Sequence, residues 1–383
     1  MIILWIVLAL LAVYVLFVLA PSLLFHFVIF SGRRAPLKKA AVSEPQLAQA
    51  DEFLRSQPHR PISITARDGA ELHGVFFDAG SRKTALFLHG YNTAPQHCVG
   101  LQAAFLFRNG FNIAYTYLRG HSGSGGVSTL GIKESSDLLL WIPALKEQTD
   151  TEQFLLYGVS MGGTTVAYAS DKLDGELVKG MVLDCSFISP YMQLEREMIR
   201  RHLPVALIGP LLTLFARWFA GIDVKVQTTD SLRHASIPAL FMHGGADETV
   251  PIDKGRESYD ACASAKTWYS VPGAAHTLCF RLGGEDAEKA LLDFARACFP
   301  EDREEAGDNN ITDNITEGET EDEQIRYRSR YHLRSERRVS EKVRHRRSAR
   351  PRGASRQKRD PLGRKMGKIH TRRVLRRSEE TPR

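Results

Sequence analysis

The stretch Gly158-Val159-Ser160-Met161-Gly162 constrains the fold more than any other feature of this chain. It has the form G-x-S-x-G. The preceding residues 153–157 are typical of a buried strand, and residues 163–169 can begin a helix. A sharp strand-to-helix turn of this form lifts a serine hydroxyl above the edge of a sheet, and its glycines avoid clashes. The motif alone is weak, but in this context it predicts that Ser160 is a nucleophile.

The pattern of apolar runs predicts an α/β fold with a mainly parallel central sheet and helices on both faces. An Arg67-Asp68-Gly69 turn joins the first two strands into a hairpin. A helix at about residues 285–297 closes the domain, which we assign to residues 61–300. The predicted strands are residues 62–65, 72–77, 84–88, 112–117, 153–157, 180–183, 238–242 and 267–271.

The interval between the strands at 180–183 and 238–242 is too long for a simple crossover. It contains a charged helical segment and then an apolar one. We interpret residues 187–232 as a helical cap insertion whose apolar face lines an acyl-binding pocket. The alternative is an elaborated crossover packed on the sheet.

Two further residues follow predicted strand ends, where a serine nucleophile needs its base and its orienting acid. Asp247 follows the strand at 238–242, and His276 follows the strand at 267–271. The chain order of serine, acid and histidine is the one that this type of turn requires. We therefore assign Ser160 as nucleophile, His276 as general base and then acid, and Asp247 as orienter.

Other residues could take two of these roles. Asp184 also ends a strand and is an alternative acid, and Glu248 is a weaker one. We expect His243 to pack at its strand end instead of transferring protons.

A tetrahedral intermediate needs two backbone N–H donors. We assign them to Met161, which follows the nucleophile, and to Tyr91, in the loop after the strand at 84–88. Gly90 allows this loop to approach the substrate closely, and His89 orders it.

Five motifs occur in order along the chain. They are His89-Gly90, Arg119-Gly120-His121-Ser122-Gly123-Ser124, residues 158–162, His243-Gly244 with Asp247 and Val250-Pro251, and Gly273 with His276. Together they resemble the α/β-hydrolase superfamily, in particular its single-domain serine hydrolases of the acyl-hydrolase and prolyl-oligopeptidase-like branch. The resemblance covers about residues 60–300. It implies the α/β-hydrolase fold and the triad but no particular substrate.

Residues 2–30 are almost wholly apolar and long enough to cross a bilayer. No basic residue precedes them, which favours an uncleaved transmembrane helix over residues 1–30 against a signal peptide. Arg33, Arg34, Lys38 and Lys39 follow directly, so the positive-inside rule predicts a single-pass membrane protein with its hydrolase domain on the cytoplasmic face. Residues 31–60 are assigned as a linker. All candidate catalytic groups lie beyond residue 60, so this segment is expected to set location alone.

Residues 301–383 form a charged tail, which we predict to be disordered. Its first part, residues 301–324, carries eleven acidic residues against one arginine. Residues 325–383 carry 23 Lys or Arg against five acids. This basic run is suited to contact with anionic lipid, and its few aromatic residues argue against nucleic acid. The alternative is a solvated tail that binds no partner.

The sequence indicates no cofactor and no metal. The five cysteines are scattered and show no C-x-x-C spacing, so we expect reduced thiols. The leading hypothesis is a membrane-anchored serine hydrolase that cleaves an ester or related acyl bond of a small-molecule or lipid substrate. The alternatives are a serine peptidase or amidase on the same fold, and a non-catalytic scaffold with a lipid- or nucleic-acid-binding tail.

Overall fold

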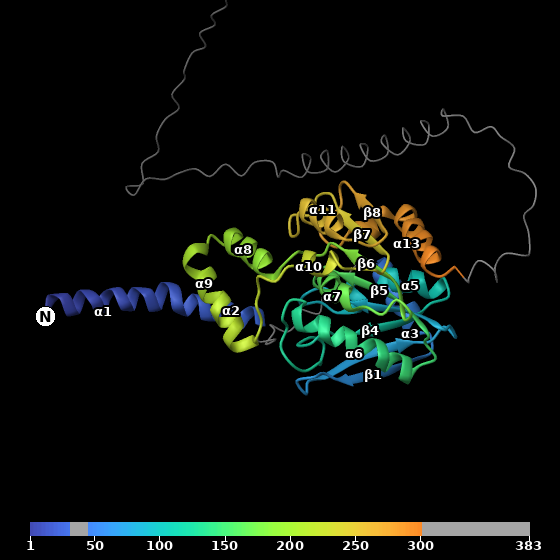
Figure 1. The fold of residues 1–383 in the computed structure, drawn as a ribbon, viewed down its shortest axis with the longest axis horizontal. Coiled ribbons are helices and arrows are strands. Elements are labelled where there is room, and N and C mark those ends of the chain that lie inside the picture. Colours follow the sequence, from blue (N-terminus) through green and yellow to red (C-terminus); the bar gives the residue numbers. More distant parts are fainter. Residues whose placement is uncertain (31–44, 301–383) are drawn as a thin grey trace, which may run out of the picture. The chain divides into compact units, whose positions relative to one another are not determined.

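An eight-stranded sheet forms the centre of the computed structural model, which describes residues 1–30 and 45–300 (Figure 1). All eight predicted strands are present. Their spatial order is β1-β2-β4-β3-β5-β6-β7-β8. The strands are β1 (His59–Thr65), β2 (Glu71–Phe77), β3 (Lys83–Leu88), β4 (Asn112–Thr116), β5 (Gln153–Val159), β6 (Val178–Asp184), β7 (Ala239–Gly244) and β8 (Lys266–Val271).

The sheet is mainly parallel, as predicted. β2 runs antiparallel to both of its neighbours, and its hairpin with β1 pairs Ile64 with Leu72. The strands from β4 to β8 all pair in parallel. The carboxyl ends of these six strands therefore lie along one edge, where functional groups of open α/β sheets gather.

Two apolar cores lie on opposite faces of the sheet, because successive strand residues point to opposite sides. Leu86 and Leu88 of β3 belong to the first core, whereas Ala85 and Phe87 belong to the second. All four are at most 1% exposed. This burial on both faces explains why the central strands are continuous apolar runs without alternating polar residues.

Helices cover both faces. The helices that contribute to the first core include α6 (Ile132–Gln148), α7 (Met161–Ala169) and α10 (Thr228–Leu232). Those that contribute to the second include α3 (Pro45–Arg55), α5 (Gly100–Arg108), α12 (Cys279–Gly283) and α13 (Glu285–Cys298). The short helices α4 (Pro95–Cys98) and η2 (Ser170–Lys172) connect elements, and α11 (Ile252–Ala261) packs against β7.

The long interval between β6 and β7 is helical, as predicted. It contains α8 (Pro190–Arg200), α9 (Val205–Phe215), the π-helical turn η3 (Ala216–Ala220) and α10. The hydroxyl of Ser189 caps α8 by accepting the amide hydrogen of Met192 at 3.2 Å. Leu194 and Met198 on the inner side of α8 are almost fully buried in the first core.

The prediction of a transmembrane helix over residues 1–30 is not supported. Within residues 1–30 and 45–300, no helix is both long and apolar enough to cross a membrane. The segment is divided into α1 (Ile2–Tyr14), the π-helical turn η1 (Val15–Leu19) and α2 (Ala20–Phe30). The division has a chemical cause: Ala20 donates its amide hydrogen five residues back to Val15, and Pro21, which follows, has no amide hydrogen.

Two segments of the predicted organisation lie wholly or partly outside the described residues. They are the tail at 301–383 and residues 31–44 of the predicted linker. The remainder of that linker includes α3, whose Leu54 is 1% exposed and belongs to the second core.

Replacing Trp141 by alanine is expected to lower the free energy of unfolding by about 3–5 kcal/mol, because the side chain is 2% exposed in the first core and its removal leaves a cavity. Trp218 is 76% exposed and provides the matched control. Its replacement by alanine should change stability by no more than about 0.5 kcal/mol. Urea unfolding measures both, and equal losses would contradict the assigned core.

Candidate active site

Ser160 lies in the turn that joins β5 to α7. Its backbone φ of 53° is in the left-handed region, which a non-glycine residue adopts only where its surroundings enforce it. The amide of Ser160 donates to the carbonyl of Asp184 at 2.7 Å, and the Ser160 carbonyl accepts from Thr164 at 2.9 Å. These bonds fix the turn at both ends and hold the serine at the carboxyl edge of the sheet.

The two glycines of the motif are required by close packing. A Cβ atom on Gly162 would collide with the carbonyl oxygen of Leu88 in β3. A Cβ atom on Gly158 would collide with the carbonyl of Gly162 itself. The turn therefore packs directly against the neighbouring strand, and this contact sets the height of Ser160 above the sheet.

The structure brings the three predicted triad residues together. His276 Nε2 lies 2.9 Å from Ser160 Oγ, and His276 Nδ1 lies 2.6 Å from Asp247 Oδ2. With Asp247 ionised, Nδ1 carries the proton and Nε2 accepts from the serine hydroxyl. This arrangement can withdraw a proton from Ser160 as its oxygen attacks an acyl carbon.

Asp247 is oriented by its own loop. Its Oδ1 accepts amide hydrogens from Thr249 at 2.8 Å and Val250 at 2.9 Å, which leaves Oδ2 directed at His276. His243 packs at its strand end, as predicted. It is 1% exposed, stacks on Trp268 and lies 2.9 Å from the Val250 carbonyl through Nε2.

Asp184, the alternative acid, occupies a different place. Its carboxyl accepts a hydrogen bond from the Tyr157 hydroxyl at 3.3 Å, whereas His276 Nδ1 bonds to Asp247. Burial raises the pKa of Asp184 to about 7. A carboxyl whose pKa lies near 7 is partly protonated at neutral pH, and Asp184 is therefore poorly suited to orient the histidine.

The loop after β3 lies beside the nucleophile. A Cβ atom on Gly90 would sit 3.6 Å from the Ser160 Cβ, in ordinary contact distance. Leu118 donates its amide hydrogen to His89 Nε2 at 3.1 Å, and Asn92 donates its own to His121 Nε2 at 3.0 Å. The two histidines thus tie this loop to the glycine-rich loop after β4.

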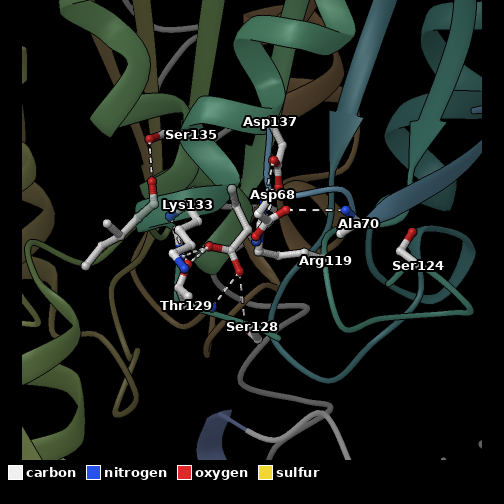
Figure 2. Close-up of polar contacts among 12 residues, drawn as sticks. Asp68, Ala70, Arg119, Ser124, Ser128, Thr129, Lys133, Ser135 and Asp137 are labelled. Carbon is white, nitrogen blue, oxygen red and sulfur yellow. Dashed lines mark hydrogen bonds and ion pairs between the residues drawn. The ribbon is translucent and has the colours of Figure 1, made fainter. Parts of the chain in front are cut away.

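The glycine-rich loop is itself anchored by a buried arginine (Figure 2). Arg119 donates from Nε and Nη2 to the two oxygens of Asp137 in α6, each at 2.7 Å. Its Nη1 reaches Asp68 at 2.8 Å in the β1–β2 turn. A fork-to-fork pair of this kind fixes direction as well as distance. The predicted family motif therefore has a structural role at Arg119.

A second buried carboxylate, Glu134, fixes the segment between the glycine-rich loop and α6. It accepts from the Thr129 amide at 2.7 Å and the Gly131 amide at 3.0 Å, in the pattern of a capping box at the start of α6. Ser128 also donates to it at 3.3 Å (Figure 2). Ser128 and Leu130, the flanking residues, line the pocket at Ser160.

A cavity of about 600 Å³ opens at the candidate triad. Its apolar wall comes from Leu130, Phe187, Leu194 and Ile29. Polar side chains of α8 line another part: Gln193, Glu197, Arg200 and the adjoining Arg201. Glu197 pairs with both arginines.

Sequence reasoning missed several of these residues. Ile29 and the α8 side chains carry no motif, since they enter the pocket through packing of distant segments. The role of Glu134 could have been predicted, because Gly131 and Glu134 have the spacing of a capping box.

The two predicted oxyanion donors lie at the pocket edge and at a helix start. Tyr91 lines the pocket together with Ser160 and His276. Met161 begins α7, where the first helical amides have no intrahelical partner.

No residue set separate from the triad was found that could hold a metal ion within the described ranges. One grouping places Cys185 within 4.8 Å of Asp247 and His276. The latter two already bond each other, so this grouping belongs to the same site. All five cysteines are free thiols.

The buried carboxyl of Asp184 yields a pH-dependent prediction. Its pKa is raised from an ordinary 3.8 to about 7, so between these values the folded protein holds a proton that the unfolded chain has released. The free energy of unfolding therefore falls as pH rises through this window. Asp184→Asn cannot lose that proton, so its stability relative to the wild type should rise from about pH 4 to about pH 7. Urea unfolding across that range measures the difference, and a pH-independent difference would contradict the raised pKa.

A family model described as the alpha/beta hydrolase fold matches residues 84–203. Among curated proteins, the chain is 22% identical over 240 residues to uncharacterized protein YfhR of Escherichia coli strain K12, covering 61% of this chain and 79% of that protein. It is 25% identical over 196 residues to lysophosphatidylserine lipase ABHD12 of Danio rerio, covering 49% of each.

Solved structures agree on the fold. The Pyrococcus furiosus esterase Pf2001 superposes with a TM-score of 0.53 at 22% identity, covering 64% of this chain and 93% of that one. The matched residues 84–203 run from β3 through the elbow to the end of α8. By its sheet order, its elbow and these matches, the chain has the α/β-hydrolase fold.

Proposed function

We propose that this protein is a serine hydrolase of the carboxylesterase or lipase type, which cleaves an ester or related acyl bond through an acyl-enzyme. The observation that carries the proposal is the continuous bonding from Ser160 Oγ through His276 to Asp247, at 2.9 and 2.6 Å. Serine needs such a base to attack at neutral pH, and the base needs an orienting carboxylate.

In this proposal Ser160 Oγ attacks the acyl carbon as its proton passes to His276 Nε2. The oxyanion of the tetrahedral intermediate accepts from the backbone amides of Met161 and Tyr91. His276 then donates its proton to the leaving oxygen, and the acyl group remains on Ser160. Water activated by His276 attacks the acyl-enzyme, releases the acid and restores the serine. Asp247 holds the imidazole in the required tautomer throughout.

The pocket supports an acyl substrate. Leu130, Phe187, Leu194 and Ile29 give it an apolar wall beside Ser160, which suits a hydrocarbon chain better than a polar peptide backbone. The relatives' names include a lipase and an esterase. A peptidase or amidase on the same fold stays the alternative, and so does a scaffold without activity. Turnover of aminoacyl amides faster than p-nitrophenyl esters would favour the former.

We further propose that the enzyme acts at a lipid surface. Several apolar side chains of α1 are exposed, among them Trp5 at 68% and Leu4 at 60% exposed. In the insertion, Trp218 and Phe219 are 76% and 55% exposed. Apolar surface of this extent is typical of an interaction site, and aromatic residues suit a membrane interface. The insertion would then act as the cap over the site.

Two further proposals rest on the sequence alone. The cytoplasmic face is proposed from the basic residues at 33–39, and the anionic-lipid contact from the basic run at 325–383. Both segments lie outside the described residues. Nucleic acid is not proposed as a partner.

Ser160→Ala should abolish both hydrolysis of p-nitrophenyl esters and labelling by a fluorophosphonate probe, because the attacking oxygen is lost. Loss of a triad nucleophile costs a factor on the order of a million in kcat. Ser56→Ala is the control, since that exposed hydroxyl donates to the carbonyl of Phe53 at 2.7 Å, away from the triad. Near-normal turnover by the Ser160 variant would contradict the proposal.

Asp247→Asn should lower kcat on the order of ten-thousandfold, because the amide would leave His276 in the wrong tautomer. Asp184→Asn should retain most of the activity, since it does not bond His276. Steady-state kinetics on both folded variants measures the two effects. Greater damage from the Asp184 change would reassign the acid.

A further inference from the structure

The last turn of α2 takes part in the candidate active site. Ile29 lines the pocket that contains Ser160 and His276. Its backbone carbonyl accepts a hydrogen bond from the Tyr91 hydroxyl at 3.2 Å. Carbonyls in the last turn of a helix lack intrahelical partners and are free to accept from elsewhere. The N-terminal segment thus reaches the loop that we assign to the oxyanion hole.

α2 is held in this position by buried contacts. Phe30 is 2% exposed and belongs to the first core. His26 is also 2% exposed, and its ring lies 4.9 Å from that of Phe30 and 5.4 Å from that of Phe219 in η3. The end of α2 therefore packs between the sheet domain and the insertion.

Tyr91 connects α2 to the loop beside Ser160. Its ring meets the ring of His121 edge to face at 5.8 Å, and His121 Nε2 accepts from the Asn92 amide at 3.0 Å. His121 Nδ1 in turn lies 2.8 Å from the carbonyl of Arg119, which the buried carboxylate of Asp137 fixes. Tyr91 is thereby held on one side by the glycine-rich loop and on the other by α2.

We propose that α2 contributes to the active site in two ways. Ile29 is a specificity-determining residue of the acyl pocket. Tyr91 is a positioning residue whose hydroxyl fixes the oxyanion loop to α2. This inference rests on the proposed function. It replaces the expectation that the N-terminal segment sets location alone. Movement of α2 would shift both the pocket wall and the oxyanion loop. Turnover therefore depends on the position of α2 beside the pocket.

The first test compares Ile29→Ala with Leu24→Ala in the full chain in detergent. Leu24 lies on the same helix, is 66% exposed and does not line the pocket. Ile29→Ala should lower kcat/KM for p-nitrophenyl octanoate about tenfold relative to p-nitrophenyl acetate, because the longer chain loses an apolar contact. Leu24→Ala should leave that ratio unchanged. Equal ratios in the two variants would overturn the specificity role.

The second test is Tyr91→Phe, which removes the bond to Ile29 but keeps the ring and the backbone amide. It should lower kcat for p-nitrophenyl acetate about three- to tenfold with little change in KM, since the loop is loosened and the acyl pocket is intact. Tyr14→Phe on α1 is the control and should match the wild type. A Tyr91 variant with unchanged kcat would overturn the positioning role.

Labelling of wild-type Ser160 by a fluorophosphonate probe separates this inference from the proposed function. If the wild type labels and hydrolyses esters but both α2-linked variants behave as their controls, the inference is wrong and the proposed function stands. If the wild type neither labels nor hydrolyses, both are wrong. Thermal melting of each variant checks that changes in turnover do not come from unfolding.

Discussion

The contact between the elbow and β3 is the constraint on which the site depends. Gly162 packs against the carbonyl of Leu88 so closely that no side chain fits between them. This contact forces Ser160 into its left-handed backbone conformation at φ 53° and directs its side chain out of the sheet edge. The strain is offset by burial on both faces of the sheet, where Leu156 and Tyr157 of β5 have no exposed surface.

Parallel pairing then brings the partners of Ser160 to the same edge. Asp247 follows β7 and His276 follows β8, and both strands run parallel to β5 through β6. Residues separated by more than a hundred positions in the chain therefore meet within hydrogen-bond distance. The loops between them are fixed by buried polar pairs, above all Arg119 with Asp137, because loops over a reactive group need precise placement without a core of their own.

Sequence reasoning predicted the sheet and the triad because both leave local signals. Central strands appear as continuous apolar runs, and Asp247 and His276 follow such runs directly. The pocket wall could not be predicted in the same way. Ile29 and Arg200 reach it only through packing of α2 and α8, which no spacing in the sequence records.

The structure of the N-terminal segment likewise could not be predicted from the sequence. Its apolar composition predicted a membrane-spanning helix, but composition does not reveal how backbone hydrogen bonds divide the helix around Pro21. Nor does it reveal that Phe30 and His26 are buried against the rest of the chain. Tertiary contacts decided both points, and such contacts give α2 the role that we propose for it.

The central claim is that Ser160 carries the acyl group during turnover. Acid quenching during hydrolysis of p-nitrophenyl butyrate, followed by proteolysis and mass spectrometry, tests it most directly. The account predicts a butyryl group on the peptide that contains Ser160, present while substrate remains and absent once it is exhausted. Continued hydrolysis with no acyl group on Ser160 at any quench time, or with the acyl group on another residue, would contradict it.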